Sequence, residues 1–268
     1  MARILITGAA GNIGKTLREG LRGRYALLRL SDIAPLGAAE RGEEVVRADI
    51  EDFAATRQSM KNIDCVVHLG AIPIEGPWEK ILPINIAGTY NVFEAARQQG
   101  VKRVVFASSN HAIGYYRRSQ TIDGTAQPRP DSRYGVSKAF GEALGHMYAD
   151  KHGMEVACLR IGTFRDRPVE RRHLSTWISP RDMVQLVQRC IDAPRFHFVI
   201  AYGVSANPRS FWDNRIAERQ LGYVPQDSAE AFAAELLAKE EPHDPVSFTF
   251  QGGPFCSDEF DGDASLIE

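Results

Sequence analysis

One segment of the chain, Tyr134-Gly135-Val136-Ser137-Lys138, places a phenol and an ammonium group four residues apart. On an α-helix, residues at this spacing share a face, so we expect the two side chains to project together. A neighbouring ammonium group favours the phenolate and lowers the pKa of a tyrosine, which makes Tyr134 a candidate general base and Lys138 its partner. The pattern alone is common, and a surface pair on an amphipathic helix is the alternative.

A second group of reactive side chains, Ser108-Ser109-Asn110-His111, follows an apolar run that is expected to be a buried strand. A serine hydroxyl at the end of such a strand can hold a reacting oxygen against the tyrosine. Ser109 is the better candidate for this catalytic role. For Ser108 we expect a hydrogen bond to the backbone instead.

Three glycines follow the first apolar run of the chain at intervals of three residues: Gly8, Gly11 and Gly14. Gly8 allows a tight turn off a strand, Gly11 lets backbone amides approach a pyrophosphate, and Gly14 lets a helix pack close to the strand. A helical pattern begins at Asn12 and Ile13, and the helix N-terminus adds partial positive charge for the phosphates. This context predicts a dinucleotide site, and a glycine turn in another α/β fold is the alternative.

An acidic residue, Asp32, ends the second apolar run about 20 residues beyond the glycines, as in dinucleotide-binding units. A carboxylate there can accept hydrogen bonds from both ribose hydroxyls of NAD, and it would repel the extra phosphate of NADP. Asp32 therefore predicts NAD as the cofactor. With such a site upstream, catalysis becomes the favoured interpretation of Tyr134 and Lys138, and the lysine can also reach the nicotinamide ribose.

Short apolar and β-branched runs alternate with helical patterns along most of the chain. The alternation predicts a doubly wound, Rossmann-type α/β fold with a parallel sheet of about seven strands, in the order 3-2-1-4-5-6 with a seventh added. Ligands are then expected at the carboxyl ends of strands 1, 4 and 5. The expected strands are 3–7, 27–31, 44–47, 64–69, 103–108, 155–160 and 197–201, and the clearest helices are 83–99, 134–152 and 180–192.

The pattern loosens after about residue 162, which predicts two regions. Residues 1–162 are expected to form an NAD-binding Rossmann domain. Residues 163–268 are expected to hold the last Rossmann elements, at about 180–202, and a small substrate-binding cap over the carboxyl edge of the sheet.

Composition argues against several classes of protein. Of the 268 residues, 44% are hydrophobic and 25% are charged, and the net charge of −2 gives no basic footprint for nucleic acid. No apolar run approaches the ~20 residues of a membrane span. The first strand begins at the N-terminus with no signal peptide before it, so we expect a cytoplasmic protein. The four cysteines are scattered and no metal-ligand spacing is present, so no metal is expected.

Together these motifs resemble the extended short-chain dehydrogenase/reductase family, over roughly residues 1–200. The resemblance implies a catalytic triad of Ser109, Tyr134 and Lys138. It also implies a homo-oligomer, because helices at 83–99 and 134–152 often pair in this family. The further cofactor contacts that it implies are Asp49 at the adenine, Ile50, Leu69, Gly70, Ala71, Asn85 and Ile161; for Asn85, a polar residue on a helix surface is the alternative.

A narrower resemblance is to the bacterial uronate dehydrogenases within that family, and it spans nearly the whole chain. It is carried by residues 107–116, 160–162, 172, 174–177, 212–214 and 250–253. Such enzymes oxidise D-glucuronate or D-galacturonate with NAD to the aldarolactone. The resemblance implies that Tyr134 removes the proton of the C1 hydroxyl while hydride leaves C1. The implied substrate contacts are Ser109, Asn110, His111, Tyr134, Thr163 and Arg172, the last as a bidentate partner of the carboxylate.

Several alternatives remain open at this point. Arg171 is the nearest competitor of Arg172, and His111 could be a core histidine bonded to backbone. Thr163 and Pro73 depart from relatives, which usually have serine at both positions, and this puts the substrate range in question. A sugar epimerase or dehydratase, such as one acting on nucleotide sugars, would use the same tyrosine. A non-catalytic NAD-responsive protein is the alternative of a different class.

Overall fold

The computed structural model describes residues 1–241 and 243–268. Seven parallel strands form one sheet in the order β3-β2-β1-β4-β5-β6-β9, so the predicted strand order is confirmed. The strands are β1 (Arg3–Thr7), β2 (Leu27–Asp32), β3 (Glu43–Arg47), β4 (Cys65–His68), β5 (Arg103–Ser109), β6 (Glu155–Ile161) and β9 (Phe198–Gly203).

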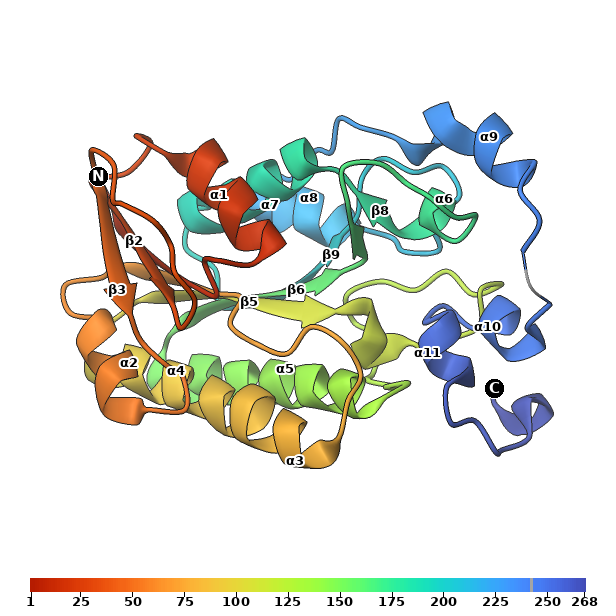
Figure 1. Ribbon diagram of the computed structural model, residues 1–268, viewed down its shortest axis with the longest axis horizontal. Coiled ribbons are helices and arrows are strands. Elements are labelled where there is room, and N and C mark those ends of the chain that lie inside the picture. The colour runs from red at the N-terminus through yellow and green to blue at the C-terminus, as the bar shows by residue number, and fades with distance from the viewer. Residues whose placement is uncertain (242) are drawn as a thin grey trace.

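Helices cover both faces of this sheet (Figure 1). On β1, Ile4 and Ile6 pack into one core layer and Leu5 into the other, as the alternation of side chains along a strand requires. The first layer also contains residues of α1 (Asn12–Leu21), α7 (Pro180–Asp192) and α8 (Arg215–Leu221). The second layer is closed by α4 (Gly88–Gln98) and α5 (Arg133–His152), with α2 (Phe53–Ser59) packed beside α4.

The prediction of one helix at 83–99 is wrong about the residue where the helix begins and about the helix type. Helical structure begins earlier, at α3 (Trp78–Ile81), and passes through a π-helical turn, Leu82–Ala87, before α4. Pro83 lies in the first turn of this π segment and cannot donate a backbone hydrogen bond, while Gly88 N donates to Pro83 O across the wider turn. The predicted helix ends are confirmed: Gly100 and Gly153 have φ of 71° and 67°.

The remaining elements are short, and several of them gather at the end of the sheet where β5 and β6 terminate (Figure 1). Whether they act as the expected substrate-binding cap, separate from a Rossmann domain at 1–162, stays a prediction. They are the paired strands β7 (Thr163–Phe164) and β8 (Trp177–Ile178), the helices α6 (His173–Thr176), α9 (Ala233–Leu237), α10 (Pro245–Thr249) and α11 (Pro254–Ser257), and the 3-10 turns Asn110–Ile113, Ala229–Phe232 and Ala264–Leu266.

All four cysteines are buried with free thiols, as core residues should be. Among the residues described, no helix combines the length and the apolar character that crossing a membrane requires.

Candidate active site

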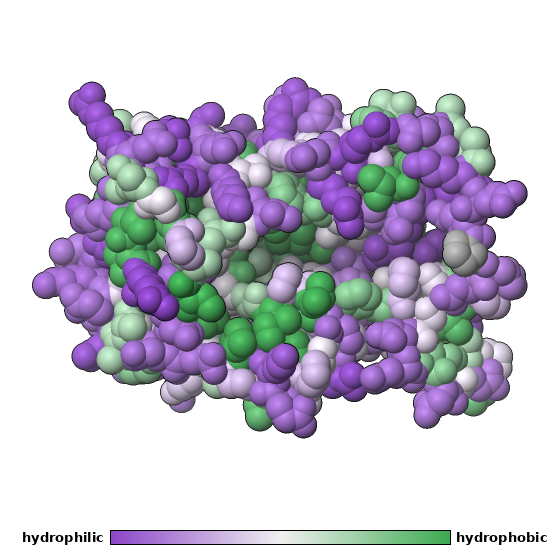
Figure 2. Space-filling view, in the orientation of Figure 1, coloured by the Kyte–Doolittle hydropathy of each residue, from purple (hydrophilic) through white to green (hydrophobic). Residues whose placement is uncertain are grey.

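The face of the molecule seen in Figure 2 is hollowed near its centre, where Figure 1 shows β5 and β6, and apolar side chains line the hollow. The carboxyl ends of β1, β4, β5 and β6 lie side by side in the sheet. This is the edge at which the sequence predicts ligand binding. The residues that follow these four strands therefore define the candidate site.

The glycine-rich loop between β1 and α1 is packed too tightly for side chains. A Cβ atom on Gly8, which has φ of 69°, would lie 2.7 Å from Gly70 N, and one on Gly14 would lie 2.6 Å from the backbone of Ala9. Gly11 is the N-cap of α1 and provides no side-chain cap, which leaves amides of the first turn without side-chain partners. Amides in this arrangement fit the pyrophosphate of a dinucleotide.

Asp32 lies at the end of β2 and is tied to the glycine-rich loop. Its Oδ2 accepts a hydrogen bond from Ala10 N at 2.8 Å, and its Oδ1 accepts one from Ala34 N at 2.9 Å. These bonds hold the carboxylate still and leave further lone pairs on both oxygens for ribose hydroxyls. A cavity of about 250 Å³ opens beside Asp32, between the loop after β2 and Arg47 of β3. The residues present therefore fit the adenosine half of NAD.

Other predicted cofactor residues lie near the carboxyl ends of the strands. The Ile50 side chain packs against Gly70 and Gly88, where a Cβ atom would lie 3.5 and 2.8 Å from it. Leu69 and Gly70 donate backbone hydrogen bonds to the two oxygens of Thr7, which joins the ends of β4 and β1. The remaining predicted contacts also sit at the loop edge: Asp49 caps Glu51 N, Ala71 follows β4, and Ile161 ends β6 beside Ser109.

Asn85 reaches the loop after β4 from the π-helical turn. Its amide accepts from Ile72 N at 2.8 Å and donates to Ile72 O at 3.0 Å and to Ser137 Oγ at 3.1 Å. The side chain is buried, so the surface alternative for Asn85 is wrong. These contacts position the loop and α5; a direct contact with the cofactor stays a prediction.

Tyr134 and Lys138 both project from α5 toward the end of β5. The lysine Nζ lies 5.4 Å from the centre of the tyrosine ring and donates to Ala107 O at 2.8 Å. Burial raises the pKa of Tyr134 to about 12, against a hydrogen bond with Ser109 that lowers it. The lowered tyrosine pKa that we expected from Lys138 is therefore wrong for the free protein, because burial outweighs the neighbouring charge. Burial also lowers the pKa of Lys138 to about 8. The structure thus brings the phenol, the ammonium group and the serine together.

Ser109 and Ser108 take the different roles that the sequence predicts for them. Ser109 is the N-cap of the 3-10 turn after β5, where its Oγ accepts from His111 N at 3.2 Å. Ser108 points the other way and donates to Glu142 Oε1 at 2.6 Å. The partner is a buried carboxylate instead of the backbone that we expected. Ser109 is therefore the serine available to a ligand.

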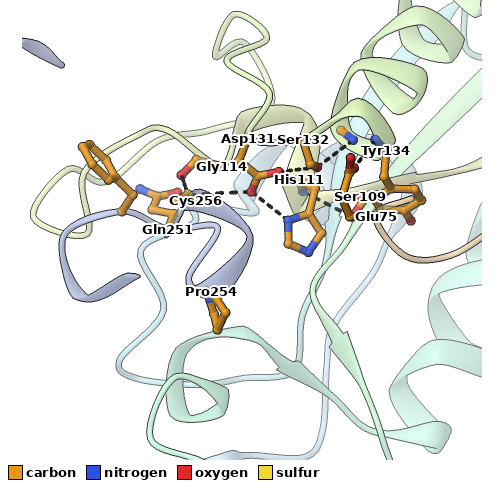
Figure 3. Close-up of polar contacts among 12 residues, drawn as sticks. Glu75, Ser109, His111, Gly114, Asp131, Ser132, Tyr134, Gln251, Pro254 and Cys256 are labelled. Atoms are coloured by element: carbon orange, nitrogen blue, oxygen red, sulfur yellow. Dashed lines mark hydrogen bonds and ion pairs between the residues drawn. The ribbon is translucent and has the colours of Figure 1, made fainter. Parts of the chain in front are cut away.

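His111 is held by a carboxylate and is not a core histidine bonded to backbone. Its Nδ1 lies 2.7 Å from Asp131 Oδ2 (Figure 3). Its ring stacks on Phe255 of α11 with centroids 4.0 Å apart, and its centroid lies 5.9 Å from that of Tyr134. The imidazole therefore forms a wall of the site beside the candidate base.

Arg172 faces the site, whereas Arg171 faces away from it. The Nε and Nη2 atoms of Arg172 donate to Gln251 O at 3.0 and 2.8 Å. The side-chain amide of Asn110 can be oriented so that both its oxygen and its nitrogen form hydrogen bonds. In this orientation the oxygen accepts from Arg172 Nη2 at 2.8 Å and the nitrogen donates to Ile161 O at 3.0 Å. Arg171 instead donates to backbone carbonyls at residues 237 and 239.

The guanidinium of Arg172 has no counter-ion within the described ranges. Desolvation and the charge of Arg118 lower its pKa to about 10, and the nearest acidic groups act only at longer range. Its carbonyl partners are neutral. A cation held in this way is suited to bind an anionic group of a ligand.

The two departures from the expected pattern lie at opposite sides of the site. Thr163 Oγ1 lies 3.0 Å from Thr176 Oγ1, which donates to Arg172 O at 3.2 Å, so the threonine hydroxyl joins a chain that ends at the arginine backbone. Pro73 is exposed in the loop between β4 and α3.

Sequence reasoning missed three residues that build this site: Glu75, Asp131 and Phe255. Glu75 caps α5 by accepting from Tyr134 N at 2.8 Å. A signal for Asp131 existed, because Asp131-Ser132 precedes the helix that carries Tyr134, and Ser132 is its N-cap. Phe255 lies more than a hundred residues from His111 and carried no local signal. Across the described ranges, no group of three or more His, Cys, Asp or Glu residues could hold a metal ion.

Comparison with known proteins agrees with this geometry. Residues 4–246 match the NAD dependent epimerase/dehydratase family. The uronate dehydrogenase of Pseudomonas putida is 47% identical over 256 residues, which cover 95% of this chain and 95% of that protein. The crystal structure of uronate dehydrogenase from Agrobacterium tumefaciens has a TM-score of 0.91 at 44% identity and covers 96% of this chain and 97% of that one. The same values hold for a tyrosine-to-alanine variant of that enzyme, solved in complex with NAD.

Proposed function

The chain belongs to the NAD dependent epimerase/dehydratase family, and we propose that it oxidises a hexuronic acid, D-glucuronate or D-galacturonate, at C1 to the aldarolactone with NAD. Similarity to uronate dehydrogenases over 95% of the chain supports NAD-dependent uronate oxidation. The observation that carries the choice of substrate is Arg172, a cation bonded to Asn110 that has no counter-ion among the residues the structure describes.

NAD, when bound, supplies the acceptor for the hydride that leaves C1. The fit rests on the side-chain-free turn at Gly8 and Gly14, on the uncapped start of α1 and on the anchored carboxylate of Asp32. We propose that the following residues hold the cofactor: Gly8, Gly11, Asn12, Ile13, Gly14, Asp32, Asp49, Ile50, Leu69, Gly70, Ala71, Asn85, Tyr134, Lys138 and Ile161.

Tyr134 acts as the base in this proposal, and Ser109 holds the C1 hydroxyl against it. With a pKa of about 12, the phenol of the free protein is protonated at neutral pH. Positive charge nearby favours the phenolate. Lys138 supplies such a charge, since a pKa of about 8 leaves it mostly protonated at pH 7. Tyr134 therefore has to lose its own proton before it can accept that of the C1 hydroxyl, and the proposed role of Lys138 is to favour this ionisation.

Arg172 binds the substrate carboxylate and fixes the end of the sugar remote from C1. Its bonds to Gln251 O and Asn110 use Nε and both protons of Nη2, so the two protons of Nη1 stay available to an anion. Fixing both ends of the substrate aligns C1 with the base, and such positioning supplies a large part of catalysis. His111, Asn110 and Thr163 are proposed to contact ring hydroxyls.

The test is NADH formation, followed by absorbance, when the protein is mixed with NAD and either uronic acid. We expect rapid NADH formation with a uronic acid and little with glucose or galactose. An epimerase or dehydratase would keep the hydride on a bound cofactor and accumulate no NADH. Absence of NADH with every uronic acid would refute the substrate assignment.

We also propose a homo-oligomer that pairs through α4 and α5. The support is that these helices expose the apolar side chains of Tyr90, Val136 and Met147. Sedimentation of the protein at micromolar concentration tests this proposal, and a monomer throughout would refute it.

A further inference from the structure

We propose that Asp131 is a positioning residue for this reaction. It holds the imidazole of His111 in the tautomer with its proton on Nδ1, so that the unprotonated Nε2 accepts a hydrogen bond from a hydroxyl of the sugar. The identity of the sugar rests on the proposed function. The state of the imidazole does not, because it is a property of the free protein.

The contacts of Asp131 determine the direction of its hydrogen bond to His111. The side chain of Asp131 is 0% exposed, whereas that of His111 is 14% exposed. Ser132 Oγ donates to Asp131 Oδ1 at 2.7 Å. Cys256 Sγ lies 3.8 Å from Oδ2 and closer, at 3.4 Å, to Gly114 O. An ionised carboxylate only accepts hydrogen bonds, so His111 Nδ1 has to carry the proton across the 2.7 Å contact.

Two glycines make the space that this carboxylate occupies. A Cβ atom on Gly114 or on Gly252 would lie 1.9 Å from Asp131 Oδ2. Gly114 follows the 3-10 turn that carries His111 (Figure 3). Gly252 belongs to the C-terminal segment, residues 245–268, and donates from its backbone N to Gly114 O at 2.9 Å. The carboxylate is thus enclosed between two distant parts of the chain and cannot swing away from the imidazole.

The second nitrogen of the ring is directed into the site. Figure 3 shows it pointing away from Asp131, and no hydrogen bond to Nε2 is formed within the described part of the chain. Nε2 is also accessible to solvent. Among the described residues, Arg171 Nε is the one fully buried side-chain nitrogen or oxygen without a partner, so the unpartnered Nε2 of His111 is not fully buried. Stacking on Phe255 at 4.0 Å fixes the plane of the ring. An open acceptor in a fixed plane is suited to a directional bond from a hydroxyl.

His68 provides the contrasting case within the same protein. Gly70 N donates to Thr7 Oγ1 at 3.3 Å, and we expect the hydroxyl proton of Thr7 to go to His68 Nδ1 at 2.8 Å. His68 Nε2 then carries the ring proton toward Thr89 Oγ1 at 3.3 Å. The two buried environments therefore predict opposite tautomers, with the proton on Nε2 in His68 and on Nδ1 in His111.

The first test is the nitrogen spectrum of the full chain labelled with ¹⁵N-histidine, recorded without ligands. His111→Gln and His68→Gln assign the two signals. We expect an unprotonated Nε2 for His111 and an unprotonated Nδ1 for His68. A protonated Nε2 on neutral His111 would overturn the proposal, and this readout needs no change at Asp131.

The second test compares Asp131→Asn with the native protein in steady-state kinetics. We expect kcat/KM for the uronic acid to fall roughly tenfold, mainly through KM, as for one lost hydrogen bond. With one substrate analogue that lacks a ring hydroxyl, the difference between the two proteins should disappear. A loss of the same size with every deoxy analogue would overturn the role of Asp131 in hydroxyl binding.

The matched control is Asp182→Asn, which alters another buried carboxylate whose partners are Ser205 Oγ at 2.6 Å and the backbone amides of residues 226 and 227, none of them a proposed site residue. We expect it to change stability without changing KM. If Asp131→Asn does not fold, the tautomer of native His111 still decides the proposal. Failure of the native protein to form NADH would refute the uronate assignment alone, since the nitrogen spectrum is measured without substrate.

Discussion

Replacing Arg172 by methionine removes the cation proposed to bind the substrate carboxylate while keeping an apolar chain of similar length. Within the described residues, the guanidinium has no counter-ion. In the free protein the substitution therefore removes only hydrogen bonds to neutral groups, Gln251 O and Asn110. The main effect should therefore fall on the complex. Truncating one partner of a buried, hydrogen-bonded charge pair costs about 2–5 kcal/mol. At 1.36 kcal/mol per factor of ten, this is a loss of roughly 30- to 5,000-fold in kcat/KM.

The assay measures NADH formation from a uronic acid and from the corresponding neutral hexose. For Arg172→Met, we expect the preference for the uronic acid to collapse, because only the charged substrate uses the guanidinium. The preference of Arg172→Lys should fall between those of the native protein and Arg172→Met, since lysine keeps the charge and loses the planar fork. Arg171→Met is the matched control: its guanidinium binds the carbonyls of residues 237 and 239, so the preference should be unchanged.

The reasoning is refuted if Arg172→Met keeps the native ratio of kcat/KM for uronic acid to that for hexose. A drop with both substrates by the same factor would mean that the arginine supports the C-terminal segment and does not read the carboxylate. Measuring NAD affinity in the same variant separates either outcome from damage to the cofactor site.

The other predictions concern the base, the glycine-rich loop and a buried histidine. Tyr134→Phe should lower kcat by about 10²- to 10⁴-fold, as for loss of a general base, while NAD titration gives an unchanged Kd; native turnover would show that the base is wrongly assigned. Gly14→Ala should weaken NAD binding in a calorimetric titration and lower Tm, because its Cβ would lie 2.6 Å from the Ala9 backbone; an unchanged Kd would contradict the close packing. Burial lowers the pKa of His68 to about 3, so stability should be complete above the unfolded pKa of about 6.5 and fall as pH drops toward 3. Between pH 6.5 and pH 4.5 His68 should contribute a loss of about 2 kcal/mol in urea melts, and His68→Gln should flatten that slope.

The order of the sheet could be predicted because the information is local. Each strand is an apolar run that ends at a turn, and right-handed crossovers leave few topologies. The type of helix around residues 83–99 was harder to predict, because the apolar pattern continues through the π-helical turn that begins at Leu82. A pattern of side chains reports which face is buried and says little about how the backbone hydrogen bonds are paired.

The candidate site could be predicted where motifs have fixed spacing. Tyr134 and Lys138 lie on one face of α5 as their spacing requires, and Ser109 caps the turn after β5. The choice between Arg171 and Arg172 depended on the fold, because neighbouring residues point in different directions and the sequence does not say which faces the sheet edge. For the same reason the roles of Asn110 and Thr163 toward a substrate stay predictions.

The docking position of the C-terminal segment, residues 245–268, could not be predicted, because the segment is attached mainly through its backbone. Arg118 donates to Phe250 O and Ser247 O, Arg117 to Ala264 O and Ile267 O, and Arg172 to Gln251 O. Backbone carbonyls accept such bonds whatever the local side chains are, so the residues of the segment carry little signal of where it docks. Yet the same segment brings Gly252 against Asp131 and Phe255 against His111. The segment thus shapes together the two sides of the site that we propose to bind the hydroxyl and the carboxylate, and a change in its docking should alter both sides at once.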